Sequence, residues 1–386
     1  MRGAWVVMDV LVVGGGIAGL ATARALRRRD VPVTVAERGD TGAGGLAINL
    51  PGNAVTAFAA LGLADGLQKL GRTTHRREYR SARDRLLFAV DEDAFWGPEA
   101  RPRCVRRSDL LALLADSLDV PVRRPLTVTG VRPSADGAEV TFGDGTVKTF
   151  DFVVGADGVH SIVRATAIDG PASSAGGPGS AGGRSGTQSA LLSAASWRFM
   201  APNPGIDCWT VWSGKGGAFL LIPVDDDTVY GYASATGGGA VSADADWLQN
   251  TFGDYPPPVR RVLDGLTDLY HSPVEEVRTG TWAAGNCVLV GDAAHATAPV
   301  WAQGAALAVE DGLVLADLLA DGDWDGAGAR YEQLRRDRVT HVRAATDRFS
   351  RAAALPVWLR DLLLPRIGPR TYRTTYDPLR HPFPAP

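Results

Sequence analysis

The residues from Asp9 to Arg38 form the pattern that most restricts how this chain can fold. They read "DVLVVGGGIAGLATARALRRRDVPVTVAER". Val10–Val13 is a continuous apolar run, typical of a strand that is buried on both faces. A G-x-G-x-x-G turn follows, then a helical segment, a second apolar strand at 31–36 and the acid Glu37. Strand, glycines, helix, strand and acid in this order predict a Rossmann-type βαβ unit.

Each part of this turn has a physical role in binding a dinucleotide. The first glycine allows the tight turn, the second lets the backbone approach a pyrophosphate, and the third lets the helix pack close to the strand. The helix start offers free N–H groups to the phosphates, and the acid accepts hydrogen bonds from a ribose. The alternative is a glycine-rich turn in an unrelated α/β fold, and the turn alone does not separate NAD from FAD. The residues expected to bind the cofactor here are Gly14, Gly16, Ile17, Ala18, Gly19, Glu37 and Arg38.

Composition narrows the class of protein. The chain has 386 residues, 45% hydrophobic and 22% charged, which suits a globular protein with core enough for two domains. A net charge of −3 without blocks of like charge argues against nucleic-acid binding. Three widely separated cysteines predict neither a disulfide framework nor a metal site. Asp9, Arg24 and four glycines interrupt the apolar stretch 4–26, so we expect no membrane anchor and a cytoplasmic protein.

Two later stretches repeat the theme of a strand followed by glycine and acid. "FDFVVGADGVHSIVR" (150–164) ends its strand at Gly155 and continues with Asp157 and Gly158. "NCVLVGDAAHATAPVWAQGAALAVEDGLVLADLL" (286–319) has a strand, Gly291-Asp292, a loop and a helix from about residue 303. Ligands of open parallel sheets bind beyond the carboxyl ends of the strands. Three strands therefore deliver a glycine or an acid to one edge, a spacing that suits an extended cofactor.

With these motifs the chain resembles the group A flavoprotein monooxygenases, the FAD-dependent aromatic hydroxylases typified by p-hydroxybenzoate hydroxylase. The resemblance covers most of the chain and favours FAD over NAD. It implies that the Gly-Asp acid contacts the ribityl chain, that the arginine opening "RSDLLALL" reaches FAD, and that segment 44–63, with Asn53, passes the isoalloxazine ring. The further cofactor-binding residues that it implies are Arg107, Asp157, Gly158, Gly291, Asp292, Pro299, Gly304 and Ala305.

The loop after the third strand departs from the family pattern. Relatives often read P-P-x-x-G-Q-G-x-N, whereas residues 298–306 read "APVWAQGAA", with Ala302 for a usual glycine and the bulky Trp301. The resemblance places this loop at the flavin edge and implies catalytic roles for Pro299, Gly304 and Ala305, the last two through backbone N–H groups. His295 is expected to orient the loop rather than to act as an acid or base, and the sequence offers no clear general base.

The expected fold class is α/β: a Rossmann-type FAD-binding domain with an inserted antiparallel-sheet substrate domain and C-terminal helices. Between 190 and 279, apolar and aromatic residues alternate with polar ones and are punctuated by Gly, Pro and Asp, which predicts antiparallel strands. Basic residues after 329 suggest a solvated helix face. The resemblance implies an FAD domain at 1–72, 104–170 and 280–360, a substrate domain at 73–103 and 190–279, a flexible linker at 170–190 and a turn-rich tail at 361–386.

Several residues of the predicted substrate domain are candidates for contact with a substrate. Its aromatic residues line an aromatic-tolerant pocket or form sheet core, and alternation does not say which face meets the flavin. The arginine of "SWRFM", Arg198, either binds a substrate carboxylate or forms an ion pair with another side chain of the sheet. The candidates, with one loop residue added, are Arg198, Trp209, Trp212, Phe219, Tyr232 and Trp301.

The resemblance implies an FAD-dependent monooxygenase. NADH or NADPH reduces FAD transiently, O2 forms a flavin C4a-hydroperoxide, and one oxygen atom enters an aromatic or polyketide-like molecule, most simply by hydroxylation in antibiotic biosynthesis or aromatic catabolism. A single G-x-G-x-x-G argues against a separate nicotinamide domain. We expect a monomer or homodimer. The alternatives are an epoxidase, a flavin-dependent reductase and a non-catalytic flavin-fold protein that shields an intermediate; W-x-x-W at Trp209 and Trp212, in place of W-x-W-x-I-P, counts against a halogenase.

Overall fold

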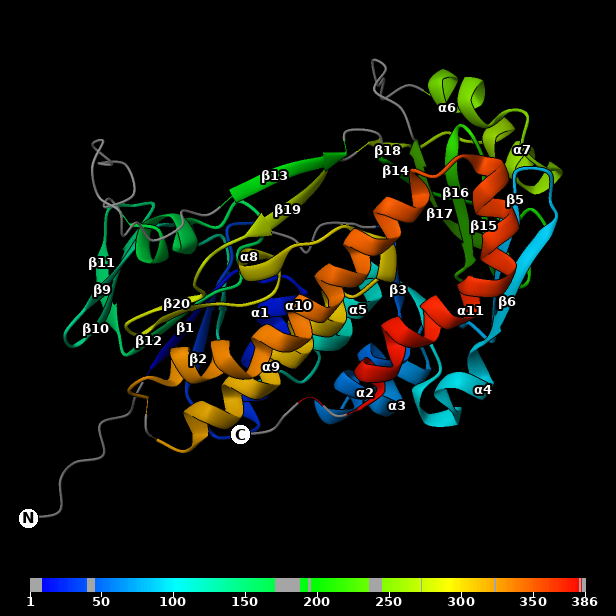
Figure 1. Ribbon diagram of the computed structural model, residues 1–386. Helices are drawn as coiled ribbons and strands as arrows, with labels where there is room; N and C mark the ends of the chain where they lie inside the picture. The colour runs from blue at the N-terminus through cyan, green and yellow to red at the C-terminus, as the bar shows by residue number, and fades with distance from the viewer. Residues whose placement is uncertain are drawn as a thin grey trace, which may run out of the picture.

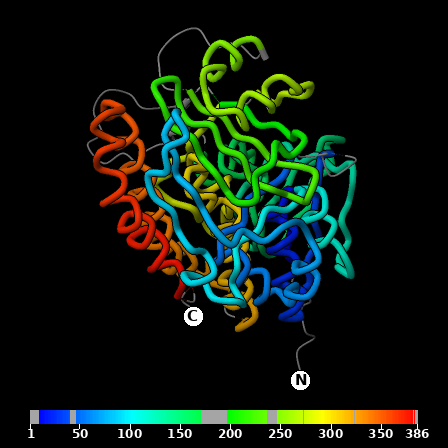
Figure 2. The backbone as a smooth tube through the Cα atoms, turned by 90° about the vertical axis from the view of Figure 1, so that its right-hand side faces the viewer, coloured from blue at the N-terminus to red at the C-terminus, as the bar shows by residue number. Residues whose placement is uncertain are grey.

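The computed structural model describes residues 9–39, 46–170, 188–193, 196–235, 245–271, 273–322, 324–381 and 383. Two main sheets lie side by side, a mostly parallel sheet on the left of Figure 1 and a mostly antiparallel one on the right. Figure 2 views the second sheet from outside, with α11 along its edge. The expected α/β fold class is therefore confirmed, and none of the described helices is long and apolar enough to cross a membrane.

The parallel sheet has six strands, and its central strand is the apolar run that opens the chain. That strand, β1, pairs in parallel with β2 and β12, and β12 pairs in parallel with β21. The registers place Val13 beside both Gly155 and Ala36, so the strands end together. In sheet order the strands are β20 (Ala283–Ala284), β21 (Cys287–Leu289), β12 (Phe152–Gly155), β1 (Val10–Val13), β2 (Val33–Ala36) and β8 (Val122–Arg123).

Small residues let two helices pack closely beside this sheet. α1 (Ile17–Arg27) buries a run of alanines and Thr22 against α9 (Gly304–Ala320). A Cβ added to Gly312 of α9 would lie 2.8 Å from the Cα of Thr22, so only glycine permits this approach. α10 (Ala327–Ala353) packs in turn on α9. The glycine turn before α1 and the amino end of α9 are thereby fixed relative to each other.

The second sheet has seven strands and combines the two predicted inserts. β5 and β6 come from 73–103, and β15 of the second insert pairs in parallel with β5. The four predicted aromatic-rich strands are all present, and α6 (Ala245–Phe252) and α7 (Pro257–Asp264) pack on one face. In sheet order the strands are β18 (Tyr270–His271), β14 (Ser196–Pro202), β17 (Thr228–Ala235), β16 (Gly217–Pro223), β15 (Trp209–Ser213), β5 (Arg76–Ser81) and β6 (Leu86–Asp91).

Smaller elements complete the fold. A three-stranded sheet of β9 to β11, which the sequence did not suggest, packs against β12. The smaller strands are β3 (Ala47–Leu50), β4 (Arg72–Thr73), β7 (Arg103–Arg106), β9 (Val128–Ser134), β10 (Gly137–Phe142), β11 (Val147–Phe150), β13 (Gln188–Ser193) and β19 (Val274–Arg278). The short helices are α2 (Gly52–Ala60), α3 (Ala64–Gln68), α4 (Glu92–Trp96), α5 (Arg107–Ala115) and α8 (Asp292–His295); helical turns span Pro98–Ala100, Arg164–Ile168 and Pro299–Trp301.

The carboxyl-terminal stretch corrects one prediction. In place of a turn-rich tail, α11 (Val357–Arg380) is a helix with three internal prolines. Tyr372, Tyr376 and Leu379 recur at helical spacing and are buried in the main core. The Trp96 indole N–H donates to the Tyr372 hydroxyl at 3.0 Å. This packing outweighs the loss of the helix hydrogen bonds that proline cannot make. Most of the predicted linker, 171–187, lies outside the described residues.

Candidate active site

The parallel sheet brings the predicted glycines and acids to one edge. Since β1, β2, β12 and β21 run in parallel and end in register, the residues that follow them are neighbours. Gly14 follows β1, Glu37 follows β2, Asp157 lies two residues beyond β12, and Gly291 begins the turn after β21. This juxtaposition is the one that the three strand–glycine–acid stretches predicted.

In the glycine turn only Gly16 borders open space, whereas a side chain at Gly14 or Gly19 would collide with the protein backbone. A Cβ on Gly19 would overlap the carbonyl oxygen of Gly14, which itself has φ +110°. A Cβ on Gly16 would meet no protein atom within 4 Å, so this residue faces open space at the amino end of α1. The Glu37 carboxylate accepts hydrogen bonds from the Gly15 and Gly39 N–H groups at 2.5 and 2.8 Å, which fixes it at the rim of the turn.

Asp157 uses only one of its carboxylate oxygens within the protein. Oδ2 accepts hydrogen bonds from the Ile162 and Val163 N–H groups at 2.7 and 3.3 Å, and so caps the helical turn that follows. Oδ1 is buried and accepts no hydrogen bond from any described residue. Burial raises the pKa of this carboxyl, and the hydrogen bonds that it accepts oppose the rise. Asp157 thus fixes the helical turn that follows β12, beside the glycine turn.

Asp292 lies at the same edge, in the turn after β21. Its side chain is open to solvent, yet surrounding protein desolvates the carboxyl enough to raise its pKa. The charges of His295, Arg198 and Arg107 oppose this rise. Arg107, at the start of α5, is held by its backbone N–H, which donates to the Leu46 carbonyl at 2.9 Å. Both arginines therefore act electrostatically on the acid that the Gly-Asp motif singled out.

A buried ionic network fixes the turn that carries Asp292. The Asp311 carboxylate of α9 accepts hydrogen bonds from the Gly291 N–H at 2.8 Å and the Arg335 guanidinium at 2.8 Å, and is 2.7 Å from His295 Nε2. Burial alone would raise the pKa of Asp311, but the charges of His295 and Arg335 and these hydrogen bonds hold it well below its usual value. His295 is buried and holds the Asp311 carboxylate, and its role in orienting the loop stays a prediction.

The same network reaches the loop before α9. Glu310 is fully buried and pairs with Arg335 and Arg338, and it also accepts a hydrogen bond from Asn53. Asn53 and Gln303 exchange two side-chain hydrogen bonds of 2.9 and 3.1 Å. Gln303 directly precedes the first residue of α9, so these hydrogen bonds tie the start of that helix to Asn53 of α2.

The loop itself carries the departures from the family pattern. Ala302 adopts a left-handed conformation, φ +53°, which explains why glycine is usual there. Trp301 is 6% exposed and its ring packs edge-on against Phe349 and Tyr376, while its carbonyl accepts a 2.9 Å hydrogen bond from the Tyr376 hydroxyl. Trp301 is therefore a core residue that joins the loop to α10 and α11, and its prediction as a substrate contact is wrong.

The seven-stranded sheet separates the other predicted substrate residues by face. Trp212 and Phe219 are buried in the core that faces α6 and α7, so these two predictions are also wrong. Trp209 packs on the opposite face, against Ala47 of β3 and the strand β7. Side chains two residues apart share a face, and Met200 and Tyr230 lie on this second face. Their neighbours Arg198 and Tyr232 therefore also point toward the parallel-sheet half.

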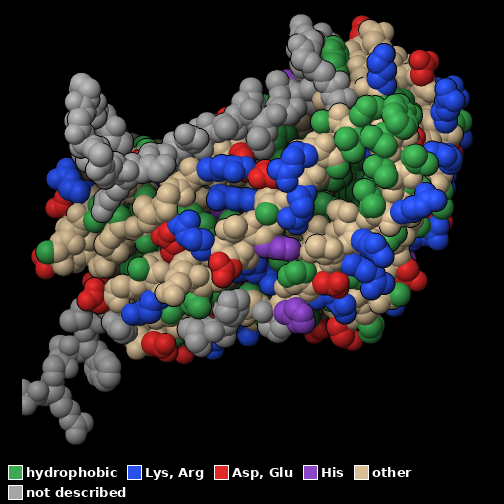
Figure 3. Space-filling model, in the orientation of Figure 1, with side chains coloured by type: hydrophobic (Ala, Val, Ile, Leu, Met, Phe, Trp, Pro, Cys, Tyr) green, Lys and Arg blue, Asp and Glu red, His purple; other side chains and the backbone are tan. Residues whose placement is uncertain are grey.

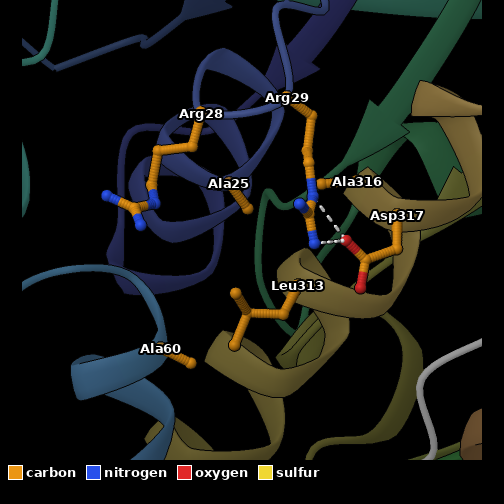
Figure 4. A pocket seen from close by; sticks show the side chains of 7 residues that line it. All are labelled: Ala25, Arg28, Arg29, Ala60, Leu313, Ala316 and Asp317. Atoms are coloured by element: carbon orange, nitrogen blue, oxygen red, sulfur yellow. Dashed lines mark hydrogen bonds and ion pairs between the residues drawn. The ribbon is translucent and has the colours of Figure 1, made fainter.

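A separate cavity lies away from this edge. It measures about 100 Å³ and is lined by the carboxyl end of α1, by α2 and by α9 (Figure 4). Arg29 reaches across it to Asp317, with a 2.6 Å hydrogen bond from Nε, while Arg28 points away from that pair (Figure 4). Since α1 has 11 residues, this cavity is about 16 Å from the glycine turn. It is too small and too far to belong to the site.

Sequence reasoning missed the residues that support the site from behind. Glu310, Asp311 and Arg335 are fully buried, although a solvated face was expected for the basic helix that carries Arg335. One signal was present. Two adjacent acids follow the apolar run "ALAV" and precede "GLVLA" in one helical segment, and acids buried in this way are almost always paired.

Comparisons with known proteins agree on one family. A sequence model of the FAD binding domain matches residues 7–348. The chain is 30% identical to 3-amino-4-hydroxybenzoate 2-monooxygenase of Streptomyces platensis, over 94% of this chain and 93% of that protein. It is 28% identical to 2-heptyl-3-hydroxy-4(1H)-quinolone synthase of Pseudomonas aeruginosa, over 95% of this chain and 96% of that protein.

Solved structures share the fold. HpxO of Klebsiella pneumoniae, in complex with FAD and uric acid, superposes with a TM-score of 0.77 at 24% identity, over 97% of this chain and 92% of that one. The tetrameric form of 2-methyl-3-hydroxypyridine-5-carboxylic acid oxygenase gives a TM-score of 0.76 at 22% identity, over 97% and 98% of the two chains.

Proposed function

This chain belongs to the family of FAD-dependent monooxygenases that act on aromatic compounds, and we propose that its own substrate is a small aromatic anion, a ring that carries a carboxylate or an ionised hydroxyl. The observation that carries this proposal is Arg198. It projects from the seven-stranded sheet toward the parallel-sheet half, and its charge acts on Asp292. A guanidinium in that position binds carboxylates and phenolates well.

The residues at the sheet edge suit FAD. We assign the pyrophosphate to the open face of Gly16 and the amino end of α1, where free N–H groups and the helix dipole favour negative charge. Glu37 is held where an adenosine ribose would donate to it. The exposed carboxyl of Asp292 is available to hydroxyl groups of the cofactor, and Asp157 holds the turn after the neighbouring strand β12. Arg107, beside Asp292, supplies a cation to the same part of the site.

When bound, FAD accepts a hydride from NADH or NADPH and activates O2 for transfer of one oxygen atom to the substrate. The chain's own residues hold and shield the reacting groups. Gly304 and Ala305 lie in the first turn of α9, whose free N–H groups favour negative charge at the adjacent edge of the cofactor. Pro299 opens the helical turn before α9, and the buried Trp301 fixes that turn against α10 and α11.

The two large sheets correspond to two functions, cofactor binding and substrate binding. We assign FAD binding to 1–72, 104–170 and 280–360, and substrate binding to 73–103 and 190–279. In support, β5 of the first insert pairs with β15 of the second, so the two inserts form one sheet. The substrate would lie between the loop at Pro299 and the sheet face that bears Arg198, Trp209 and Tyr232.

The test combines spectroscopy with turnover. We would record the visible spectrum of the purified protein, then follow NADH and NADPH oxidation, O2 uptake and product mass with hydroxybenzoates, aminohydroxybenzoates, hydroxypyridine carboxylates and neutral quinolones. We expect a yellow flavoprotein, oxidation stimulated by an aromatic anion, and a product one oxygen atom heavier. A charged hydrogen bond is worth about 1.5–3 kcal/mol, so Arg198→Ala should raise KM for anions about 10- to 100-fold.

Two controls sharpen this experiment. Arg132→Ala removes an arginine that is 82% exposed and lies in the separate sheet of β9 to β11, and it should change neither KM nor FAD affinity. Arg198→Ala should also leave FAD affinity unchanged. Equal turnover of neutral and anionic substrates, unaffected by Arg198→Ala, would refute the anion proposal. NAD(P)H oxidation without oxygen in any product would favour a reductase, an epoxide product would favour an epoxidase, and tight ligand binding without turnover would favour a shielding protein.

A further inference from the structure

The exposed apolar side chains of this protein are concentrated at one corner. Eight large hydrophobic residues are exposed among the described residues, and five of them lie between 349 and 367, where α10 ends and α11 begins. Trp358 is 70% exposed and Leu362 56% exposed. A sixth, Leu86, lies next to Arg85, which contacts Asp361 of α11. Apolar side chains on a soluble surface are normally scattered, so this concentration indicates a contact surface.

The first half of α11 presents this apolar surface outward. Trp358 and Leu362 are four residues apart on one side of the helix, and Leu355 lies in the turn just before it; all three are exposed, whereas Tyr372 and Tyr376 of the second half are buried. In Figure 3 hydrophobic side chains gather over this half of the helix around a hollow, and Lys and Arg side chains border them. The start of α11 lies at the outer edge of the molecule in Figure 2, so a broad flat partner can reach it.

The hollow beside these residues carries positive charge. It measures about 1310 Å³ and is lined by α11, the loop between β5 and β6, and the turn after β15. Four cationic side chains line it against a single carboxylate, Asp361, although the whole chain has a net charge of −3. Arg360 is 11% exposed, and two of its guanidinium nitrogens are buried without a hydrogen bond to any described residue. The cations are Arg83, Arg85, Lys215 and Arg360.

We propose that this corner, defined by Leu355, Trp358 and Leu362 with Arg83 and Arg85, docks the protein on the surface of an anionic lipid bilayer. Tryptophan with leucine, bordered by arginines, is the combination that favours the boundary between headgroups and acyl chains. Arg83 and Arg85 are exposed, so their stems lie on the apolar surface while their guanidinium groups meet lipid phosphates. The hollow opens broadly to solvent and exceeds the usual volume of a small-molecule pocket.

Charge argues against the simplest other occupant, a second copy of this chain. A two-fold dimer through this corner would place the same cationic border against itself. An anionic surface instead neutralises these cations, and each basic residue near such a surface contributes about 1 kcal/mol, or about fivefold in Kd. The proposal does not involve the cofactor edge, because none of these residues belongs to the site.

The test is binding of the FAD-loaded full chain to lipid vesicles. One set consists of phosphatidylcholine alone, and in the other part of it is replaced by phosphatidylglycerol; binding is measured by co-sedimentation. We expect binding only to the anionic set, and weaker binding as salt rises. Trp358→Ser with Leu362→Ser, and separately Arg83→Glu with Arg85→Glu, should each weaken it at least about tenfold. All four residues are exposed, so these variants should keep their unfolding midpoint and NAD(P)H oxidation.

Matched controls use equivalent residues elsewhere. Tyr270→Ser, at 56% exposure, and Arg132→Glu, at 82%, alter an exposed aromatic and an exposed arginine outside the corner, and both should bind like the unaltered chain. Absence of binding to anionic vesicles would overturn the proposal and leave an acidic protein as the remaining anionic partner. Binding that the corner variants leave intact would overturn it as well. So would a dimer, detected by light scattering, that Trp358→Ser with Leu362→Ser dissociates.

Discussion

Replacing Asp311 by asparagine tests whether the ionic network behind the sheet edge holds the site together. Asparagine has the same shape but lacks the charge that faces Arg335 and His295. All three side chains are at most 2% exposed, so Arg335 would lose one of its two buried counterions while water stays excluded. Removing one partner of a buried pair costs about 3–5 kcal/mol. Since whole domains are stable by about 5–15 kcal/mol, this is a large part of the total.

The matched control is Asp317→Asn in the same helix. Asp317 pairs with Arg29, which is 54% exposed, and surface pairs of this kind are worth about 0–1 kcal/mol. Urea unfolding followed by far-ultraviolet circular dichroism would give the midpoints of both variants. The Asp311 variant should also bind FAD more weakly, because the Gly291 N–H loses its carboxylate acceptor. If the two variants differ by less than about 1 kcal/mol, the network does not stabilise the site.

The same carboxyl predicts how stability depends on pH. The pKa of Asp311 lies well below its usual value in the folded protein and returns to about 3.8 on unfolding. The unfolded chain therefore binds this proton at higher pH than the folded chain, so stability falls as pH falls. The contribution is complete above about pH 5 and declines as the solution is made more acidic. The stability difference between the unaltered chain and Asp311→Asn should narrow between about pH 5 and pH 3; a constant difference would contradict the argument.

Three further outcomes follow from close contacts. Gly19→Ala forces a Cβ against the Gly14 carbonyl, and overpacking of about 1–3 kcal/mol should release FAD during gel filtration without unfolding the chain. Tyr376→Phe leaves the buried Trp301 carbonyl without its 2.9 Å donor and should cost about 1–3 kcal/mol in urea unfolding, whereas an unchanged midpoint would show that the bond contributes nothing. Burial raises the pKa of Cys208 to about 11, so Ellman's reagent at pH 7.5 should react slowly with native thiols and quickly after denaturation.

The parallel half could be predicted because its signals are local. A four-residue apolar run followed by glycine and acid identifies a buried strand and the turn after it, and three such runs place their ends at one edge. The partners of the ionic network are not local. Asp311 and Arg335 are 24 positions apart on two helices, and no spacing rule joins them. Only the packing of α10 on α9 brings them together.

Alternation predicted the strands of the second sheet but not the orientation of its faces. Trp209 and Trp212 are three positions apart, so they point to opposite faces of β15 whatever surrounds the sheet. The side that meets the parallel half is decided by α6 and α7, which cover the face with Trp212. α6 begins more than 30 residues after β15 ends, so the choice depends on tertiary contacts that no strand pattern contains.

The departures from the family pattern at 299–306 become consistent once α11 is considered. A left-handed alanine at Ala302 costs about 1 kcal/mol relative to glycine, so surrounding contacts must impose that conformation. Trp301 supplies them on one side, since its ring contacts Phe349 and its carbonyl is held by Tyr376. On the other side of Ala302, Gln303 supplies such contacts through its hydrogen bonds with Asn53. The bulky tryptophan thus fastens the carboxyl-terminal helix to the loop, and the prolines of α11 are tolerated because that helix is anchored at the site rather than by its own hydrogen bonds.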